Sequence, residues 1–129
     1  MTFELTLLVW STLLFWLYIF VQAGFYQKQY GAEFAATGRD NAVAPDVRNG
    51  RAQRALRNLI ETYPVFIVLV VATALGDRSD ALTQWGGLIY LVARVAYLPL
   101  YLSGIKNLRS LAWIVSFIGL LMMFFGVAF

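Results

Sequence analysis

The sequence contains no cysteine and no histidine in its 129 residues, and charged residues make up only 13% of it. The lack of cysteine excludes disulfides, zinc–thiolate sites and a cysteine nucleophile. The lack of histidine removes the commonest general base and metal ligand, and we expect no metal site. Any acid–base chemistry must therefore use Tyr, Asp, Glu, Lys or Arg, or a group that the substrate brings.

Apolar residues, in contrast, make up 60% of the chain. A soluble domain of this size needs a far more charged surface, so most side chains are expected to face lipid or one another. A membrane-spanning helix requires about 20 apolar residues, and four such helices with short loops nearly use up the chain. We predict a single all-α domain, residues 1–129, folded as an integral membrane four-helix bundle.

Four apolar segments give the predicted spans, at about residues 5–25, 46–76, 81–102 and 108–127. The first is longer than the apolar core of a signal peptide and is interpreted as a retained helix. Pro45 and Asp46 suit the first turn of a helix, whereas Pro64 and Pro99 lie inside predicted helices and should bend them. Most of the polar stretch between the first two spans is expected to be loop.

The basic residues predict the orientation of the chain. Six of them lie between the first two spans or at the mouth of the second span: Lys28, Arg39, Arg48, Arg51, Arg54 and Arg57. Lys106 and Arg109 lie between the last two spans, whereas the connection between the second and third spans holds only Arg78 beside two aspartates. The positive-inside rule places the first and third connections in the cytoplasm and both termini on the opposite side.

Polar residues share one face of the second span. At about 100° per residue, four of them fall within an arc of roughly 80°: Arg51, Arg54, Asn58 and Glu61. Arg57 lies about 40° outside this arc by the same count. Two guanidiniums, an amide and a carboxylate therefore form one stripe.

The third span carries a matching stripe, within an arc of roughly 60°: Tyr90, Arg94, Tyr97 and Tyr101. Arg94 and Glu61 lie about 18–22 Å along two antiparallel helices from their shared turn, so they can face each other or a shared ligand. Charged residues at this depth are costly and are functional candidates. A pair that only fixes helix packing is the alternative, but it does not explain the other arginines and the tyrosines on the same faces.

The residue types on these two stripes predict the kind of ligand. Arginines in a partly dry site favour carboxylates or phosphates, and a carboxylate beside them favours an ammonium group. Glutathione, with two carboxylates, one ammonium and a thiol, fits this description. An anionic lipid headgroup fits almost as well on charge alone.

Two runs of residues carry a resemblance to a known family. The run Arg54-Ala-Leu-Arg57-Asn58-Leu-Ile-Glu61-Thr-Tyr63-Pro64 resembles the signature of the MAPEG family, the membrane-associated proteins of eicosanoid and glutathione metabolism. The later run from Arg94 to Ser110 resembles that family's third helix and following loop. The four-helix layout and the loop charges agree, so the resemblance covers nearly the whole chain.

The resemblance implies a homotrimer that binds glutathione between subunits near the cytoplasmic face. Carried over by position, the residues that would hold glutathione are Arg54, Asn58, Glu61, Arg94, Tyr97 and Tyr101. We add Arg51 and Arg57, on or beside the same stripe, to the predicted binding set. Arg109 resembles the arginine that family enzymes use to stabilise the thiolate. Arg109 and Tyr97, a hydrogen-bond donor to the developing anion, are the predicted catalytic residues.

We therefore predict a membrane-bound glutathione transferase or glutathione-dependent peroxidase. Its expected partners are membrane lipids and a hydrophobic small-molecule substrate, and no nucleic acid. The first alternative is a non-enzymatic protein of the same fold that binds a lipid or fatty acid, because the family includes a member without catalytic activity. The second is a small multidrug transporter, which needs an acid near mid-membrane in a site attractive to cations. Glu61 lies toward the cytoplasmic end among arginines, which argues against the transporter.

Overall fold

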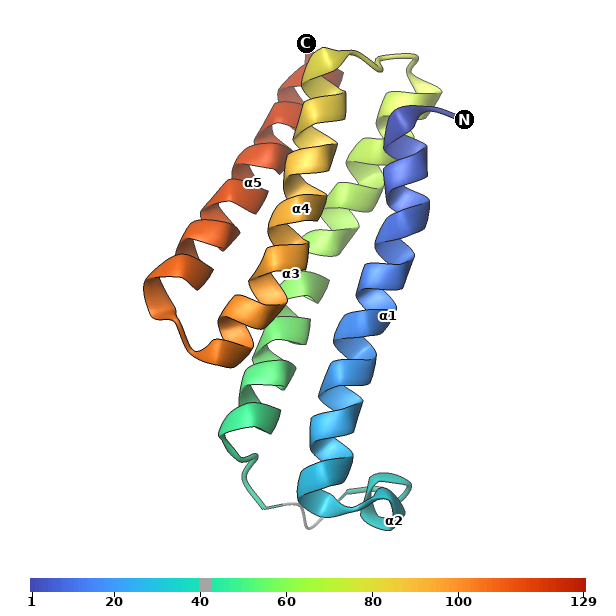
Figure 1. Cartoon of the computed structure of the whole chain (residues 1–129). Helices are drawn as coiled ribbons and strands as arrows, with labels where there is room; N and C mark the ends of the chain where they lie inside the picture. The colour runs from blue at the N-terminus through green and yellow to red at the C-terminus, as the bar shows by residue number, and fades with distance from the viewer. Residues whose placement is uncertain (40–42) are drawn as a thin grey trace.

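The computed structural model describes residues 1–39 and 43–129, and within them the chain forms five helices (Figure 1). These are α1 (Phe3–Tyr30), α2 (Ala32–Ala35), α3 (Val47–Leu75), α4 (Ala81–Ser103) and α5 (Lys106–Ala128). All except α2 are long and apolar enough to cross a membrane. The predicted all-α fold with four membrane spans is confirmed, and the protein is an integral, multi-pass membrane protein.

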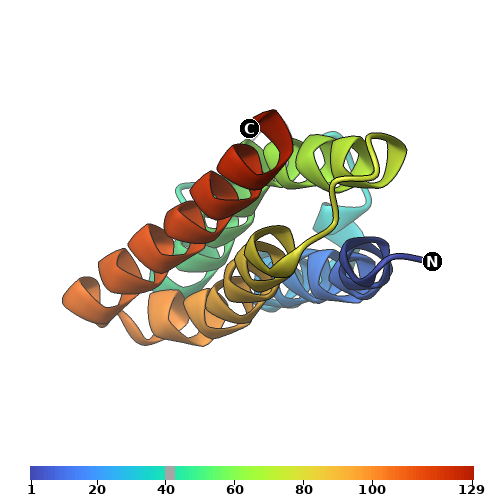
Figure 2. The same cartoon turned by 90° about the horizontal axis from the view of Figure 1, so that it is seen from above.

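The bundle has two different ends (Figure 1). Both termini and the α3–α4 connection lie at one end, which we call the terminal end. The other end carries α2 and the α4–α5 connection, and we call it the basic end because the first and third connections hold most of the basic residues between the spans. Seen from above, α4 lies between α5 and α1, and α3 completes the bundle (Figure 2).

Local capping sets the ends of the helices. Asp46 caps the start of α3 by accepting a hydrogen bond from the backbone N–H of Asn49, and Asp80 forms a capping box with Thr83 at the start of α4. Gly104, at φ 75°, ends α4 in the left-handed region that favours glycine. The two prolines predicted inside helices lie within continuous helices, Pro64 in α3 and Pro99 in α4.

The segment between the first two spans is more helical than expected from its polarity. α1 continues to Tyr30, five residues past its expected end, and stops at Gly31, which has φ 92°. The short helix α2 follows within the expected loop. Gln29 then joins this end of α1 to the start of α3, because its amide bonds the backbone of Ala44 and Asp46. A polar sequence outside the membrane can continue a helix where such bonds hold it.

Two apolar clusters form the core of the bundle. The cluster toward the terminal end contains Leu7, Phe66, Leu69, Val70, Tyr90, Leu120 and Met123. The cluster toward the basic end contains Leu14, Tyr18, Ala55, Leu59, Tyr97, Leu98 and Ala112. Many large apolar side chains lie exposed on the outside, Trp16, Val68, Val92 and Phe125 among them. This outward apolar surface is what a bilayer-embedded bundle requires.

Helices α4 and α5 approach to backbone contact at a pair of glycines. A Cβ added to Gly119 would lie 2.6 Å from the carbonyl oxygen of Gly86 and 2.7 Å from the backbone nitrogen of Tyr90. A Cβ added to Gly86 would meet the carbonyl oxygen of Gly119, also at 2.6 Å. Small residues allow membrane helices to pack this closely. The two glycines thus fix how near α5 lies to α4.

A buried carboxylate ties the start of α1 to the α3–α4 turn. Glu4 is fully buried, and both of its carboxylate oxygens accept from the Ser79 hydroxyl at 2.9 Å. The Thr83 hydroxyl donates to the same carboxylate at 2.8 Å. These bonds satisfy a charge that is otherwise costly to bury.

Replacing Glu4 with alanine should lower the free energy of unfolding by about 2–3 kcal/mol, because hydrogen bonds to a charged group are lost and the Ser79 hydroxyl loses its acceptor. Denaturation of the purified protein in detergent micelles measures the change. Glu33→Ala is the control, since Glu33 is an exposed acid on α2. Equal stability of the two variants would contradict the role of Glu4.

Candidate functional site

Arg94 on α4 lies fully buried inside the bundle. Its Nη1 donates to the Asn58 side-chain oxygen at 2.7 Å. Its guanidinium carbon lies 4.8 Å from the centre of the Tyr97 ring and 5.7 Å from that of Tyr90, which are cation–π distances. Among residues 1–39 and 43–129, the Nε and Nη2 groups have no hydrogen-bond partner. Buried donors without partners are costly, so an acceptor that bonded to Nε and Nη2 of Arg94 would be bound favourably.

Asn58 connects Arg94 to a cavity. A guanidinium has only donors, so the amide oxygen of Asn58 must face Arg94, and the amide NH2 group is left for another acceptor. Asn58 also lines a cavity of about 320 Å³ where α3, α4 and α5 meet. We call it the polar cavity; it is lined by Asn58, Tyr97, Arg109, Ser110, Trp113 and Ile114.

Tyr101 brings two further arginines to the same region. Arg54 donates through Nε to the Tyr101 hydroxyl at 3.2 Å. The Arg109 guanidinium carbon lies 4.6 Å from the centre of the Tyr101 ring, and the Tyr97 and Tyr101 rings are 5.5 Å apart. Aromatic rings can hold cations without neutralising them. The structure therefore links Arg54, Arg94 and Arg109 through two tyrosines, leaving a concentration of positive charge.

Glu61 occupies a neighbouring position and does not pair with Arg94. It is exposed on α3 and lines a second cavity, of about 310 Å³, between α3 and α5. We call this the apolar cavity, because beyond Glu61 and Thr62 its lining is hydrocarbon and aromatic. Trp113 lines both cavities. Glu61 thus lines the apolar cavity, while Asn58 takes the hydrogen bond that a carboxylate partner of Arg94 would accept.

The remaining two predicted arginines lie apart from the polar cavity. Arg51 donates through Nη1 to the carbonyl oxygen of Leu102 at 3.2 Å. Helix ends leave such carbonyls without helical partners, so Arg51 caps α4. Arg57 is exposed on α3 and does not line either cavity. The polar cavity therefore gathers Asn58, Tyr97 and Arg109 directly, and Arg94, Arg54 and Tyr101 through contacts with these or with one another.

The sequence model of the MAPEG family matches residues 6–129, essentially the whole chain. The chain belongs to the MAPEG family. Comparison with curated proteins and with solved structures gave no match. Membership confirms the resemblance carried by the polar runs of α3 and α4, and it assigns the chain to the membrane proteins of glutathione or eicosanoid metabolism.

In this MAPEG protein, two polar contacts around Arg94 had no counterpart in the sequence-based prediction. The Tyr18 hydroxyl, on α1, donates to the backbone carbonyl oxygen of Arg94 at 2.6 Å. The hydroxyls of Thr62 and Tyr90 form a 3.0 Å hydrogen bond between α3 and α4. The available signal was weak: a tyrosine or threonine inside an apolar run is uncharged and often only packs.

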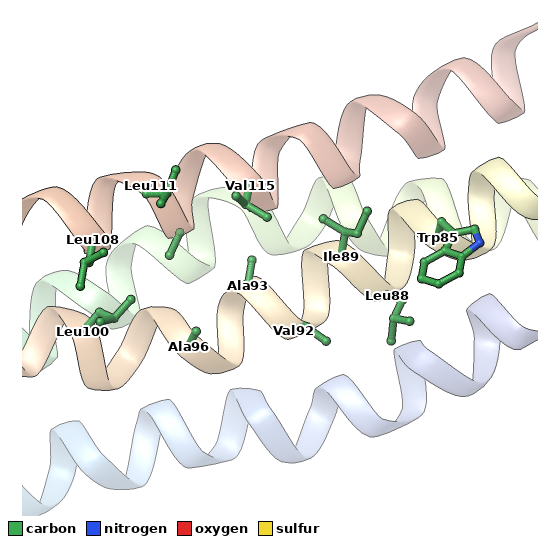
Figure 3. Close-up of a pocket in the computed structure, with 11 residues that line it drawn as sticks. Trp85, Leu88, Ile89, Val92, Ala93, Ala96, Leu100, Leu108, Leu111 and Val115 are labelled. Atoms are coloured by element: carbon green, nitrogen blue, oxygen red, sulfur yellow. The ribbon is translucent and has the colours of Figure 1, made fainter.

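A third space in this MAPEG protein lies between α4 and α5 (Figure 3). It measures about 440 Å³. Figure 3 shows Leu100, Leu108 and Leu111 near one of its ends and Trp85 at the other. The lining is hydrocarbon apart from this indole. It offers no group for acid–base or nucleophilic chemistry, so the polar cavity remains the candidate site.

Proposed function

We propose that this MAPEG protein is a membrane-bound glutathione transferase or glutathione-dependent peroxidase that acts on a hydrophobic electrophile or a lipid hydroperoxide. One observation supports the proposal most strongly. Arg94 is fully buried, and its Nε and Nη2 nitrogens have no hydrogen-bond partner in the part of the chain that the structure describes. Its partner Asn58 lines a cavity together with Tyr97 and Arg109. An anionic thiol compound provides the missing acceptors and the reacting atom.

The charges of glutathione match the residues around the two cavities. Its carboxylates suit the guanidiniums of Arg94 and Arg54, since arginine binds carboxylates with two parallel hydrogen bonds. Its ammonium group suits Glu61, which is exposed beside the polar cavity. The Asn58 NH2 group can donate to a peptide carbonyl. The two arginines thus suit the two carboxylates of the tripeptide, and the Glu61 carboxylate suits its ammonium group.

Arg109 is proposed to favour the thiolate form of glutathione. A thiol has a pKa of about 8.5 and is mostly protonated at neutral pH. Lowering this pKa by about 2 units requires about 2.7 kcal/mol of preferential thiolate stabilisation. Arg109 is half-buried beside the Tyr101 ring and lines the polar cavity. No protein base is needed, which suits a chain without histidine.

The two proposed reactions follow from this nucleophile. In a transfer, the sulfur electron pair forms a carbon–sulfur bond while the leaving group departs or an epoxide C–O bond opens, and Tyr97 donates a hydrogen bond to the anion that forms. In a peroxidase reaction, the sulfur attacks the terminal peroxide oxygen and the O–O bond breaks, which gives a glutathione sulfenic acid. The alkoxide that leaves takes up the proton that the thiol had released and becomes an alcohol. A second glutathione then reduces the sulfenic acid to yield the disulfide and water.

The apolar cavity is proposed to receive the hydrophobic substrate. It continues from Trp113 along α5, where Phe117, Leu121 and Phe124 line it. These side chains offer apolar contact and no charge, so a lipid-like molecule can enter from the bilayer with its reactive end toward Arg109. The second candidate function, a non-enzymatic lipid or fatty-acid carrier, is favoured by the entirely apolar space between α4 and α5.

We further propose the homotrimer that the family resemblance implies, with the basic end in the cytoplasm. The exposed position of Glu61 supports an assembly in which a neighbouring subunit completes the site. Light scattering of the detergent complex, corrected for bound detergent, measures the mass of the assembly.

Glutathione at about 100 times its dissociation constant should raise the free energy of unfolding by about 2.7 kcal/mol, if it binds only the folded protein. The thermal shift of the protein in micelles measures this, and Arg94→Gln should abolish it. Cysteinylglycine, which lacks the γ-glutamyl carboxylate and ammonium, is the matched control ligand and should give a much smaller shift.

An assay with a general electrophile then separates the two candidate functions. Conjugate formation that depends on the protein supports the transferase. A thermal shift with oleate but none with glutathione, together with no turnover, would instead support the lipid carrier and overturn the proposed enzyme.

A further inference from the structure

Two side-chain hydrogen bonds join α1 to α4 within residues 1–39 and 43–129. One, from Thr83 to Glu4, lies at the terminal end. The other, from the Tyr18 hydroxyl to the carbonyl oxygen of Arg94, measures 2.6 Å. Both Tyr18 and Arg94 are fully buried. The second bond therefore connects α1 to the residue on which the candidate site depends.

The backbone of α4 is weakened close to this bond. Pro99 has no N–H, so the carbonyl of Val95, four residues earlier, lacks its helical partner. Arg94 precedes Val95 directly. A carbonyl oxygen has two lone pairs, so that of Arg94 can accept from Tyr18 in addition to its helical bond. The phenol thereby fixes the α4 backbone where the helix is least constrained by its own hydrogen bonds.

Tyr18 also supports the surroundings of the Arg94 side chain. It packs in the same apolar cluster as Leu59 of α3 and Tyr97 of α4, and the Tyr97 ring is the nearer of the two rings beside the guanidinium. The Arg94–Asn58 bond is 2.7 Å long, and two side chains about 3.6 Å apart no longer form a hydrogen bond. A displacement of α4 by about 1 Å would therefore release Arg94 from Asn58.

We infer that Tyr18 is a positioning residue, which holds Arg94 at the depth and orientation that glutathione binding requires. This inference rests on the proposed function. The Tyr18 hydroxyl bonds to the backbone of Arg94, and Tyr18 does not line the polar cavity, so it acts through the arginine and not on the reacting atoms. Its effect should therefore fall on the affinity for glutathione rather than on the chemical step.

Tyr18→Phe removes the hydroxyl and keeps the ring. We expect glutathione affinity, measured by isothermal titration, to fall about 5-fold, the equivalent of one ordinary hydrogen bond. The KM for glutathione should rise by a similar factor, while kcat and the KM for the hydrophobic substrate stay unchanged. Tyr63→Phe is the matched control, because its hydroxyl also bonds to α1, through Ser11 at 2.7 Å, but away from Arg94.

The outcomes separate the inference from the proposed function. Unchanged glutathione affinity in Tyr18→Phe, with normal binding by the wild type, overturns the inference alone. Equal losses of affinity in Tyr18→Phe and Tyr63→Phe, or equal rises in both KM values, indicate a general packing effect and also overturn it. A wild-type protein that binds no glutathione overturns the proposed function together with the inference.

Discussion

Replacing Arg109 with leucine is expected to lower glutathione conjugation at pH 7 about 100-fold, while the dissociation constant of glutathione changes less than about threefold. The reason is that about 2 pKa units of thiolate stabilisation, if lost, reduce the thiolate fraction by about that factor. Arg109 lines the polar cavity beside Tyr97, whereas the carboxylate-binding arginines are proposed to be Arg94 and Arg54. The substitution should therefore lower turnover while leaving the affinity for glutathione nearly unchanged.

The pH profile of the Arg109→Leu variant adds an independent readout. The rate of the variant should rise with pH through about 8.5, as the unassisted thiol ionises, whereas the wild-type rate should level off about 2 units lower. Lys106→Leu is the matched control, because it removes the same charge from an exposed position in the same helical turn. If the Arg109→Leu variant turns over as fast as the wild type and its pH–rate profile is not shifted, the proposed role of Arg109 is refuted.

Replacing Gly119 with alanine is expected to destabilise the bundle by about 3 kcal/mol, at the upper end of the usual range for overpacking. The added methyl group would meet the backbone of Gly86 and Tyr90 at 2.6 and 2.7 Å. Backbone atoms of a packed helix cannot rotate away, so α5 must move outward from α4. Because Tyr90 lies beside the guanidinium of Arg94, glutathione affinity should fall as well.

Gly24→Ala is the control for the glycine prediction. A Cβ at Gly24 meets nothing within 4 Å, so only the higher helix propensity of alanine remains, worth about 0.5–1 kcal/mol in favour of the variant. Denaturation in the same micelles compares the two proteins. Similar stability of Gly119→Ala and Gly24→Ala would show that the close approach of α4 and α5 is not required.

The four spans were predictable because long apolar runs in a chain with so little charge have few alternatives to a bilayer. The stripe on the third span was also predictable, since helical periodicity places Arg94, Tyr97 and Tyr101 on one face, and the structure has them in one cluster. Asn58 and Arg94 meet because antiparallel neighbouring helices bring similar depths together, and the long arginine side chain covers the remaining offset along the helices. Periodicity and depth are properties of the chain itself.

Side-chain direction and helix-to-helix distance were not predictable in the same way. Arg51 lies on the predicted stripe, yet its guanidinium turns to the carbonyl of Leu102, because the end of α4 offers a free acceptor. Gly86 and Gly119 lie on different helices, so no spacing within either helix reveals their contact. Tyr18 is recognisable as a polar contact only after the register between α1 and α4 is known.

The strong contacts near the terminal end have a consequence for how a ligand reaches Arg94. Glu4 anchors α1 there, and the glycine pair holds α5 against α4. Since Arg94 has no exposed surface, a ligand in the polar cavity can reach it only when Asn58 and the other groups around the guanidinium move aside. Any movement of the helices that admits a ligand is therefore expected at the basic end, while the helix contacts at the terminal end stay in place.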